Sequence, residues 1–181
     1  MTKRKPKLFQ KEGLFNYAVR ALGGRAHSTG ELREKLRRRA ERAEDVDQVL
    51  AKLKEIGYLD DRRFAESYAA SRLENQGLGK MRVLRDLRQR RVAPQLAQQV
   101  TEKTYQETDE AELIEDFLKR KYRGKKLGEF LGEEKNLTAA YRRLRYAGFG
   151  AGASIGVLKR FAKQAEELEA LEPEDLGEPE A

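Results

Sequence analysis

Three stretches of the chain carry paired apolar residues four positions apart, and arginines cluster around the second residue of each pair. They read ELREKLRRR, VLRDLRQRR and AAYRRLRYAG, and their second apolar residues are Leu36, Leu87 and Leu144. A spacing of four places both apolar residues on one face of an α-helix. The second residues are separated by 51 and 57 positions, and another amphipathic segment follows each stretch. This repetition predicts a tandem array of helical units that stack, because one unit alone buries little apolar surface.

Helical periodicity also dominates the rest of the chain, and no segment alternates apolar and polar residues as a half-buried strand would. The sequence therefore predicts an all-α fold, an elongated curved array of three tandem three-helix repeats. We expect a basic N-terminal tail at 1–12, repeats at 13–75, 76–126 and 127–168, and an acidic C-terminal tail at 169–181.

The stretch GYLDDRRFAESYAASRL joins two of the expected helices. Gly57 stands where a left-handed C-terminal cap is expected, and Tyr58 and Leu59 can pack against the helix end. Asp60 is a suitable N-cap for the next helix, and Asp61 lies in its first turn, where the helix dipole favours negative charge. Phe64 begins the buried stripe of that helix. The alternative is a metal or acid/base site, which would need further ligands from elsewhere, so we interpret the motif as structural.

Several catalytic chemistries lack their residues in this chain. There is no cysteine, which excludes disulfides, thiolate catalysis and cysteine-bound zinc. Gly79-Lys80 is followed by Met81, where a phosphate-binding Walker loop needs Ser or Thr, and residue 74 is Glu rather than Gly. The only histidine, His27, precedes a helix-capping Ser28, and we expect it to be partly exposed and structural. We therefore expect no cofactor, no metal and no enzymatic activity.

Charge is unevenly distributed. The formal net charge is +7, but 166–181 holds eight acidic residues and no Lys or Arg, which leaves +15 on residues 1–165. A body this basic attracts polyanions, nucleic acid first; the alternative is a merely solubilising surface. No apolar run is long enough to span a membrane, the N-terminus lacks the apolar core of a secretory signal, and we expect a cytoplasmic protein.

The repeated arginines are the best functional signal, because basic residues that follow the same helix in each unit would form a stripe along one side of an array. Phosphates or an acidic protein surface could bind such a stripe. The Tyr and Phe residues lie mostly at positions of the apolar stripes. This favours the interpretation that they belong to the core, and the alternative is that they stack on nucleic-acid bases. The candidate partner- or DNA-binding residues are Arg37, Arg38, Arg39, Arg88, Arg90, Arg91, Arg142, Arg143, Arg145, Lys3, Arg4 and Lys5.

With these residues placed, the chain resembles the RecX family of RecA recombinase regulators over roughly residues 14–165. The resemblance rests on STGELREKL, then VDQVLAKLKEIGYLDDRRFAESYAASRL, then GLGKMRVLRDLRQRRV. It implies three tandem three-helix repeats and a non-enzymatic role in DNA recombination, repair and the SOS response. RecX-like proteins bind in the groove of RecA filaments on DNA and inhibit ATP hydrolysis, filament extension and strand exchange. The implied partners are a RecA filament and single- or double-stranded DNA, with the protein itself a monomer.

The chain departs from this family where the first helix of each repeated motif ends. The family often places Gly before an apolar residue there, as Gly148-Phe149 does, but the other two units have Arg91-Val92 and Ala40-Glu41. A left-handed residue other than Gly costs about 1 kcal/mol, so we expect another turn geometry at those two sites. The alternative function is a sequence-dependent DNA-binding regulator in which a helix–turn–helix unit reads the major groove.

Overall fold

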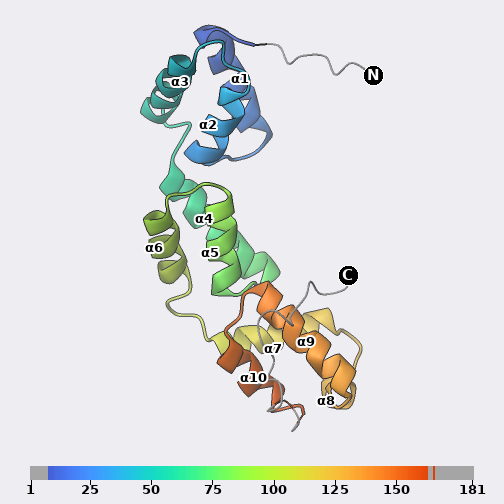
Figure 1. Cartoon of the computed structure of the whole chain (residues 1–181). Coiled ribbons are helices and arrows are strands. Elements are labelled where there is room, and N and C mark those ends of the chain that lie inside the picture. Colours follow the sequence, from blue (N-terminus) through green and yellow to red (C-terminus); the bar gives the residue numbers. More distant parts are fainter. Residues whose placement is uncertain (1–7, 163–164, 166–181) are drawn as a thin grey trace, which may run out of the picture. The chain divides into compact units, whose positions relative to one another are not determined.

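The computed structural model describes residues 8–162 and 165, so Lys3, Arg4, Lys5 and the acidic tail lie outside the described residues. The all-α class is confirmed: the described part contains helices and one isolated bridge between Phe9 and Ala40, without a named strand. The helices are labelled in Figure 1. They are α1 (Lys11–Gly24), α2 (Thr29–Arg37), α3 (Ala43–Glu55), α4 (Asp61–Gln76), α5 (Lys80–Gln89), α6 (Pro94–Thr104), α7 (Glu110–Lys121), α8 (Leu127–Leu131), α9 (Glu134–Ala147) and α10 (Ala151–Leu158).

The chain divides into two compact units. Unit 1 holds the residues up to Tyr68 together with Asp86–Val100, and unit 2 holds Ala69–Arg85 and the residues from Thr101 onward. The division passes through α4, α5 and α6, so each of these helices contributes to both units. The repeat bounds 13–75, 76–126 and 127–168, and the curved array built from them, stay predictions.

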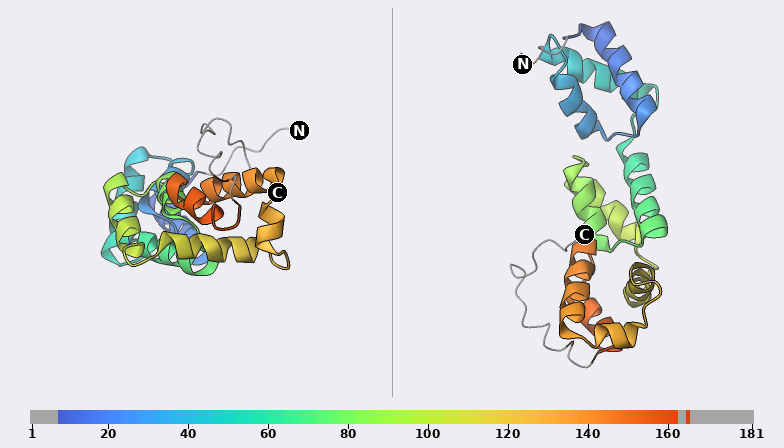
Figure 2. Two further views of the ribbon diagram at one scale, coloured as in Figure 1. Left: turned by 90° about the horizontal axis from the view of Figure 1, so that it is seen from below. Right: turned by 90° about the vertical axis from the view of Figure 1, so that its right-hand side faces the viewer.

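Helices α1, α2 and α3 pack into the three-helix bundle of unit 1, which Figures 1 and 2 show as a small group of crossed helices. Ser28 caps α2 as expected, because its hydroxyl accepts a hydrogen bond from the Glu31 N–H at 3.0 Å while the Glu31 carboxylate accepts from the Ser28 N–H. The predicted apolar stripes form the core. Its buried members are Leu14, Ala18, Leu32, Leu36, Val46, Val49, Leu50, Leu53 and Leu59.

The GYLDD motif links α3 to α4 as a turn between two caps. Gly57 has φ of +75°, the predicted left-handed conformation. The Asp60 carboxylate accepts a hydrogen bond from the Arg63 N–H at 3.0 Å, and this bond lowers the pKa of Asp60. Tyr58 is 55% exposed, so its expected packing against the helix end is wrong. Leu59, also expected there, is 4% exposed and belongs to the core with the residues of α3, as predicted.

In unit 2, α10 packs against both α7 and α9, and α8 lies beside α9 (Figure 2). Phe149 is fully buried, with its ring centroid 5.5 Å from that of Phe117 in an edge-to-face contact. The turn that puts Phe149 there begins at Gly148, which has φ of +93° as predicted for a glycine cap. The Asp109 carboxylate caps α7 by accepting from the Ala111 N–H at 2.7 Å.

Gly148 is expected to tolerate no larger residue. A Cβ there would lie closer than 3.0 Å to Arg82 and would also force a side chain into positive φ. Gly148→Ala should therefore lower the free energy of unfolding by more than about 2 kcal/mol. Gly57→Ala is the matched control, since its φ is also positive but nothing lies within 4 Å of the added Cβ. It should cost only about 1 kcal/mol; equal losses in urea unfolding would contradict this explanation.

Candidate polyanion-binding groove

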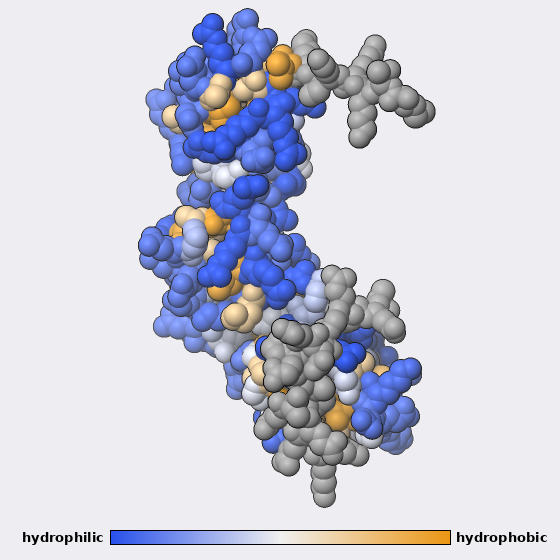
Figure 3. Space-filling model, in the orientation of Figure 1, coloured by the Kyte–Doolittle hydropathy of each residue, from blue (hydrophilic) through white to orange (hydrophobic). Residues whose placement is uncertain are grey.

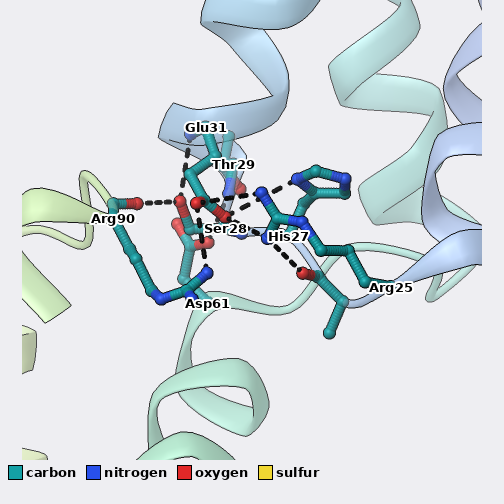
Figure 4. Close-up of polar contacts among 8 residues, drawn as sticks. Arg25, His27, Ser28, Thr29, Glu31, Asp61 and Arg90 are labelled. Carbon is teal, nitrogen blue, oxygen red and sulfur yellow. Dashed lines mark hydrogen bonds and ion pairs between the residues drawn. The ribbon is translucent and has the colours of Figure 1, made fainter. Parts of the chain in front are cut away.

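In unit 1, the start of α2 is fixed against the turn after α5 by side-chain hydrogen bonds, drawn in Figure 4. The Ser28 hydroxyl donates to the Arg90 carbonyl, and the Arg90 guanidinium donates to the Glu31 carboxylate at 3.2 Å. Asp61, from the first turn of α4, accepts from the Thr29 N–H at 2.6 Å. Asp61 thus satisfies an N–H in the first turn of another helix, a role beyond the dipole contact expected for it. We call this contact the first junction.

Glycine allows the two backbones of the first junction to approach closely. A Cβ on Gly30 would lie closer than 3.0 Å to the Cβ and carbonyl oxygen of Arg91. Arg91 itself is left-handed, with φ of +58°, so the expectation of another turn geometry is wrong at this site. The expectation holds at Ala40, which is not among the positive-φ residues and whose N–H bonds to the Leu36 carbonyl at 2.9 Å.

Unit 2 contains an equivalent second junction, between the start of α5 and the turn after α9. The Gly79 N–H donates to the Ala147 carbonyl at 2.9 Å, and the Met81 N–H donates to the Gly148 carbonyl at 3.1 Å. Gly79 follows Ser28 by 51 residues and Ala147 follows Arg90 by 57, the same offsets as those of the repeated leucines. The repeat predicted from sequence is therefore visible in the contacts between helices, and not only in the apolar stripes.

Beside the first junction, within unit 1, lies an open groove of about 470 Å³. It is lined by five cationic side chains and two carboxylates, so its formal charge is positive. The lining residues are Tyr17, Arg25, His27, Glu31, Glu34, Lys35, Arg38, Arg39, Gln89 and Arg91. The predicted candidates Arg38, Arg39 and Arg91 therefore come together from two different repeats of the sequence pattern.

The arginines after α2 and α5 divide into internal and outward-facing residues. The Arg39 guanidinium lies 5.7 Å from the centroid of the Tyr17 ring, and Arg90 lies 4.8 Å from that of Tyr68. These two pairs are related by the 51-residue offset, and their cation–π contacts help hold the end of one helix to the preceding one. Arg90 also forms an ion pair with Glu31, so its positive charge is already balanced by a carboxylate of the protein itself.

Arg37 and Arg88, again 51 residues apart, are exposed at the ends of α2 and α5. Arg38 has a side chain 75% exposed and pairs with Glu34 at 3.3 Å. Arg91 is 58% exposed at its side chain and shares the same carboxylate at 3.9 Å. Because exposed pairs of this kind contribute little stability, these guanidinium groups can exchange Glu34 for an external anion at low cost.

The third arginine cluster lies in unit 2 and is used mainly for internal contacts. Arg143 donates to the Tyr122 hydroxyl at 3.2 Å, and Arg145 donates to the Phe149 carbonyl. Arg142 is half-buried, and its Nε has no hydrogen-bond partner within the described residues. None of these three lines the groove of unit 1.

Sequence reasoning missed Arg25 and Lys35 as groove residues. Lys35 lies in the last turn of α2, three and four residues before Arg38 and Arg39, so helical spacing could have included it. Arg25 lies in the loop after α1, and no periodic signal marks it. It reaches the groove because its guanidinium donates to both oxygens of Glu31, at 3.2 and 3.3 Å (Figure 4).

His27 is buried, with 6% of its surface exposed, so the expected partial exposure is wrong. Burial lowers the pKa of His27 below 6.5, and the nearby positive charge of Arg25 lowers it further. Its Nδ1 lies 3.6 Å from the Glu31 carboxylate without a hydrogen bond. His27 therefore supports the wall of the groove as a neutral side chain at neutral pH.

Residues 8–162 and 165 contain no group of three or more side chains suited to hold a metal ion. Over the same residues, no helix is long and apolar enough to cross a membrane. On the face shown in Figure 3, hydrophilic residues cover most of the described surface, and hydrophobic ones form only small patches.

The chain is built from repeated helical segments, and equivalent junctions recur between them. A cationic groove lies beside the first junction. These features place the chain in the class of tandem helical-repeat proteins. Comparison with known proteins specifies the class further. Residues 15–53 match the model of the first three-helix domain of RecX, and residues 60–100 match that of the second. The chain is 31% identical over 162 residues to the Regulatory protein RecX of Streptomyces coelicolor, covering 88% of this chain and 81% of that protein. It therefore belongs to the RecX family.

Other relatives are matched over a shorter length. The chain is 38% identical over 113 residues to the Regulatory protein RecX of Deinococcus radiodurans, but the match covers only 52% of that relative and 61% of this chain. Two solved structures share the fold at low identity. RecX from Lactobacillus salivarius gives a TM-score of 0.58 at 14% identity, covering 83% of this chain and 96% of that one. A second crystal structure, of a regulatory protein RecX, gives a TM-score of 0.61 at 18% sequence identity, covering 81% of this chain and 70% of that one.

The buried His27 predicts a pH-dependent stability. Its pKa is lower in the folded state than in the unfolded state, where it lies near 6.5, so the unfolded chain binds more protons between the two values. The contribution of His27 to the free energy of unfolding is therefore fully present above about pH 6.5. It decreases as the pH falls toward the pKa of the folded state. As the only histidine, it gives a single imidazole signal in NMR titration.

That signal should titrate below 6.5, and the free energy of unfolding should decrease between about pH 7 and pH 5.5. His27→Gln should show a smaller decrease over the same interval, because glutamine does not titrate. A folded-state pKa at or above 6.5 would show that burial does not dominate at this position.

Proposed function

We propose that this protein is a non-enzymatic negative regulator of RecA-type recombinase filaments. It binds in the groove of the filament and inhibits ATP hydrolysis, filament extension and strand exchange. The observation that carries the proposal is family membership, supported by the 31% identity over 162 residues to a Regulatory protein RecX. The cationic groove of unit 1 supports it physically, since a filament on DNA presents both phosphates and acidic protein surface.

The proposed contact is made by the outward-facing arginines. Arg38 and Arg91 share one carboxylate, and Arg37 and Arg88 are exposed at helix ends. Each such contact is weak alone, but each phosphate neutralised releases a counterion, so several together bind strongly at low salt. Binding across neighbouring recombinase subunits would compete with the motions that ATP turnover requires. In this proposal the protein acts as a monomer in the cytoplasm.

Charge reversal tests the contact. Replacing Arg37, Arg38, Arg88 and Arg91 together by Glu should weaken inhibition of the DNA-dependent ATPase of a RecA recombinase by at least about tenfold, or 1.4 kcal/mol. The reason is that four attractive contacts become repulsive, whereas helicity measured by circular dichroism should remain unchanged.

The matched control reverses four exposed cations outside the groove, Arg20, Arg42, Lys54 and Arg62, which gives the same change in net charge. The control should inhibit nearly as well as the unmodified protein. Equal loss in both variants would mean that only net charge matters, and unchanged inhibition in the first variant would reject the arginine assignment.

A second candidate function is a sequence-dependent DNA-binding regulator. The match to two three-helix domains favours it, because small three-helix domains often present a helix to the major groove. This function predicts tight binding to particular DNA sequences without any recombinase. The two functions separate in one ATPase titration: strong inhibition at substoichiometric ratios, without comparable affinity for bare DNA, supports the filament regulator.

A further inference from the structure

Tyr146, at the end of α9, is one of the few large apolar side chains that remain exposed in the described part. It is 43% exposed, whereas Tyr141 on the same helix is 3% exposed and belongs to the core. Met81, 58% exposed, belongs to the other half of the second junction, where its N–H bonds to the Gly148 carbonyl at 3.1 Å. The second junction therefore presents apolar surface to solvent on an otherwise hydrophilic protein.

Arg82 supports the Tyr146 ring. Its guanidinium carbon lies 4.6 Å from the ring centroid, and its Nη1 is 3.5 Å from the carbonyl oxygen of the same tyrosine. A cation–π contact of this kind restricts the rotation of the ring while it is still free of ligand. Because the ring is already ordered, a ligand that stacks on it loses less conformational entropy on binding.

Further cationic side chains lie on the two helices that carry Tyr146 and Arg82. Arg142 lies one helical turn before Tyr146 and has a buried Nε without a hydrogen-bond partner in the described residues. Lys80 and Arg85 are exposed on α5, on either side of Arg82 in the sequence. An aromatic ring among cations is the arrangement by which proteins bind single-stranded nucleic acids, with stacked bases and neutralised phosphates.

We propose that the second junction binds an unpaired nucleobase, which stacks on Tyr146 while the neighbouring cations contact the adjacent phosphates. The site rests on the nucleic-acid contact in the proposed function and adds a preference for single strands to it. A base in a duplex is already stacked on both faces and is not available to the ring. The groove of unit 1 contacts charge alone, whereas this site in unit 2 requires a free base.

The chain has no tryptophan, so Tyr146→Trp introduces a single indole at the proposed site. Stacking of a base on an indole quenches its fluorescence. We expect quenching by oligothymidylate, and little quenching by a duplex of the same length or by inorganic polyphosphate, which carries charge without bases. Tyr58→Trp is the matched control, because Tyr58 is also exposed, at 55%, and lies in unit 1; it should not be quenched.

The outcomes separate the site from the proposed function. If the Tyr146→Trp variant binds oligothymidylate, measured by anisotropy, without quenching of its indole, the site is overturned and the filament regulator stays intact. Equal quenching by polyphosphate or by duplex would also overturn the site, since bases would then not be read. Quenching specific to single strands would support the site even if the recombinase ATPase were not inhibited, which would reject the proposed function alone.

Affinity measurements give an independent test. Tyr146→Ala should weaken binding of oligothymidylate by roughly 5- to 100-fold, the range for losing one stacked base. The slope of affinity against salt should stay unchanged, because no charge is lost. Tyr146→Phe keeps the ring and should bind nearly as well as the unmodified protein. Equal weakening in both variants, with an intact circular dichroism spectrum, would contradict base stacking.

Discussion

The structure depends on close backbone contact between the start of one helix and a left-handed turn after another. In unit 1, α2 meets the turn at Arg91, and in unit 2, α5 meets the turn at Gly148. Such contact is possible only where a side chain is missing. At the first junction Gly30 of the helix lies against Arg91 of the turn. At the second, the corresponding positions hold Met81 and Gly148, and Gly79, just before the helix, also lacks a side chain, since a Cβ there would lie closer than 3.0 Å to Gly148.

The first junction has its glycine in the helix, at Gly30, and not in the turn, and this explains why the left-handed turn at Arg91 could not be predicted. A left-handed arginine is unfavourable by itself by about 1 kcal/mol, and local reasoning therefore rejects it. The cost is offset by contacts that are distant in sequence, chiefly the bond from Ser28 to Arg90 and the ion pair from Arg90 to Glu31. The residue that permits Arg91 to adopt this conformation, Gly30, lies 61 positions earlier in the chain.

The arginine pattern combines two functions. Arg39 and Arg90 recur because each covers a tyrosine of the preceding helix. Arg37 and Arg88 recur in the last turns of the same helices, where their positive charge favours the helix dipole and their side chains remain exposed. Adjacent arginines in a cluster point in different directions around the helix end, so one run of sequence can stabilise the fold and remain available for binding.

The sequence by itself determined the all-α class, the buried stripes, the capping box at Ser28 and the glycine caps at Gly57 and Gly148, since these depend on periodicity and local backbone preference. It also carried the family resemblance. Only the tertiary structure decided which arginines are internal, that His27 is buried, and that Arg25 and Lys35 join Arg38 at one groove. Those properties depend on contacts between residues far apart in the chain, which helical spacing does not encode.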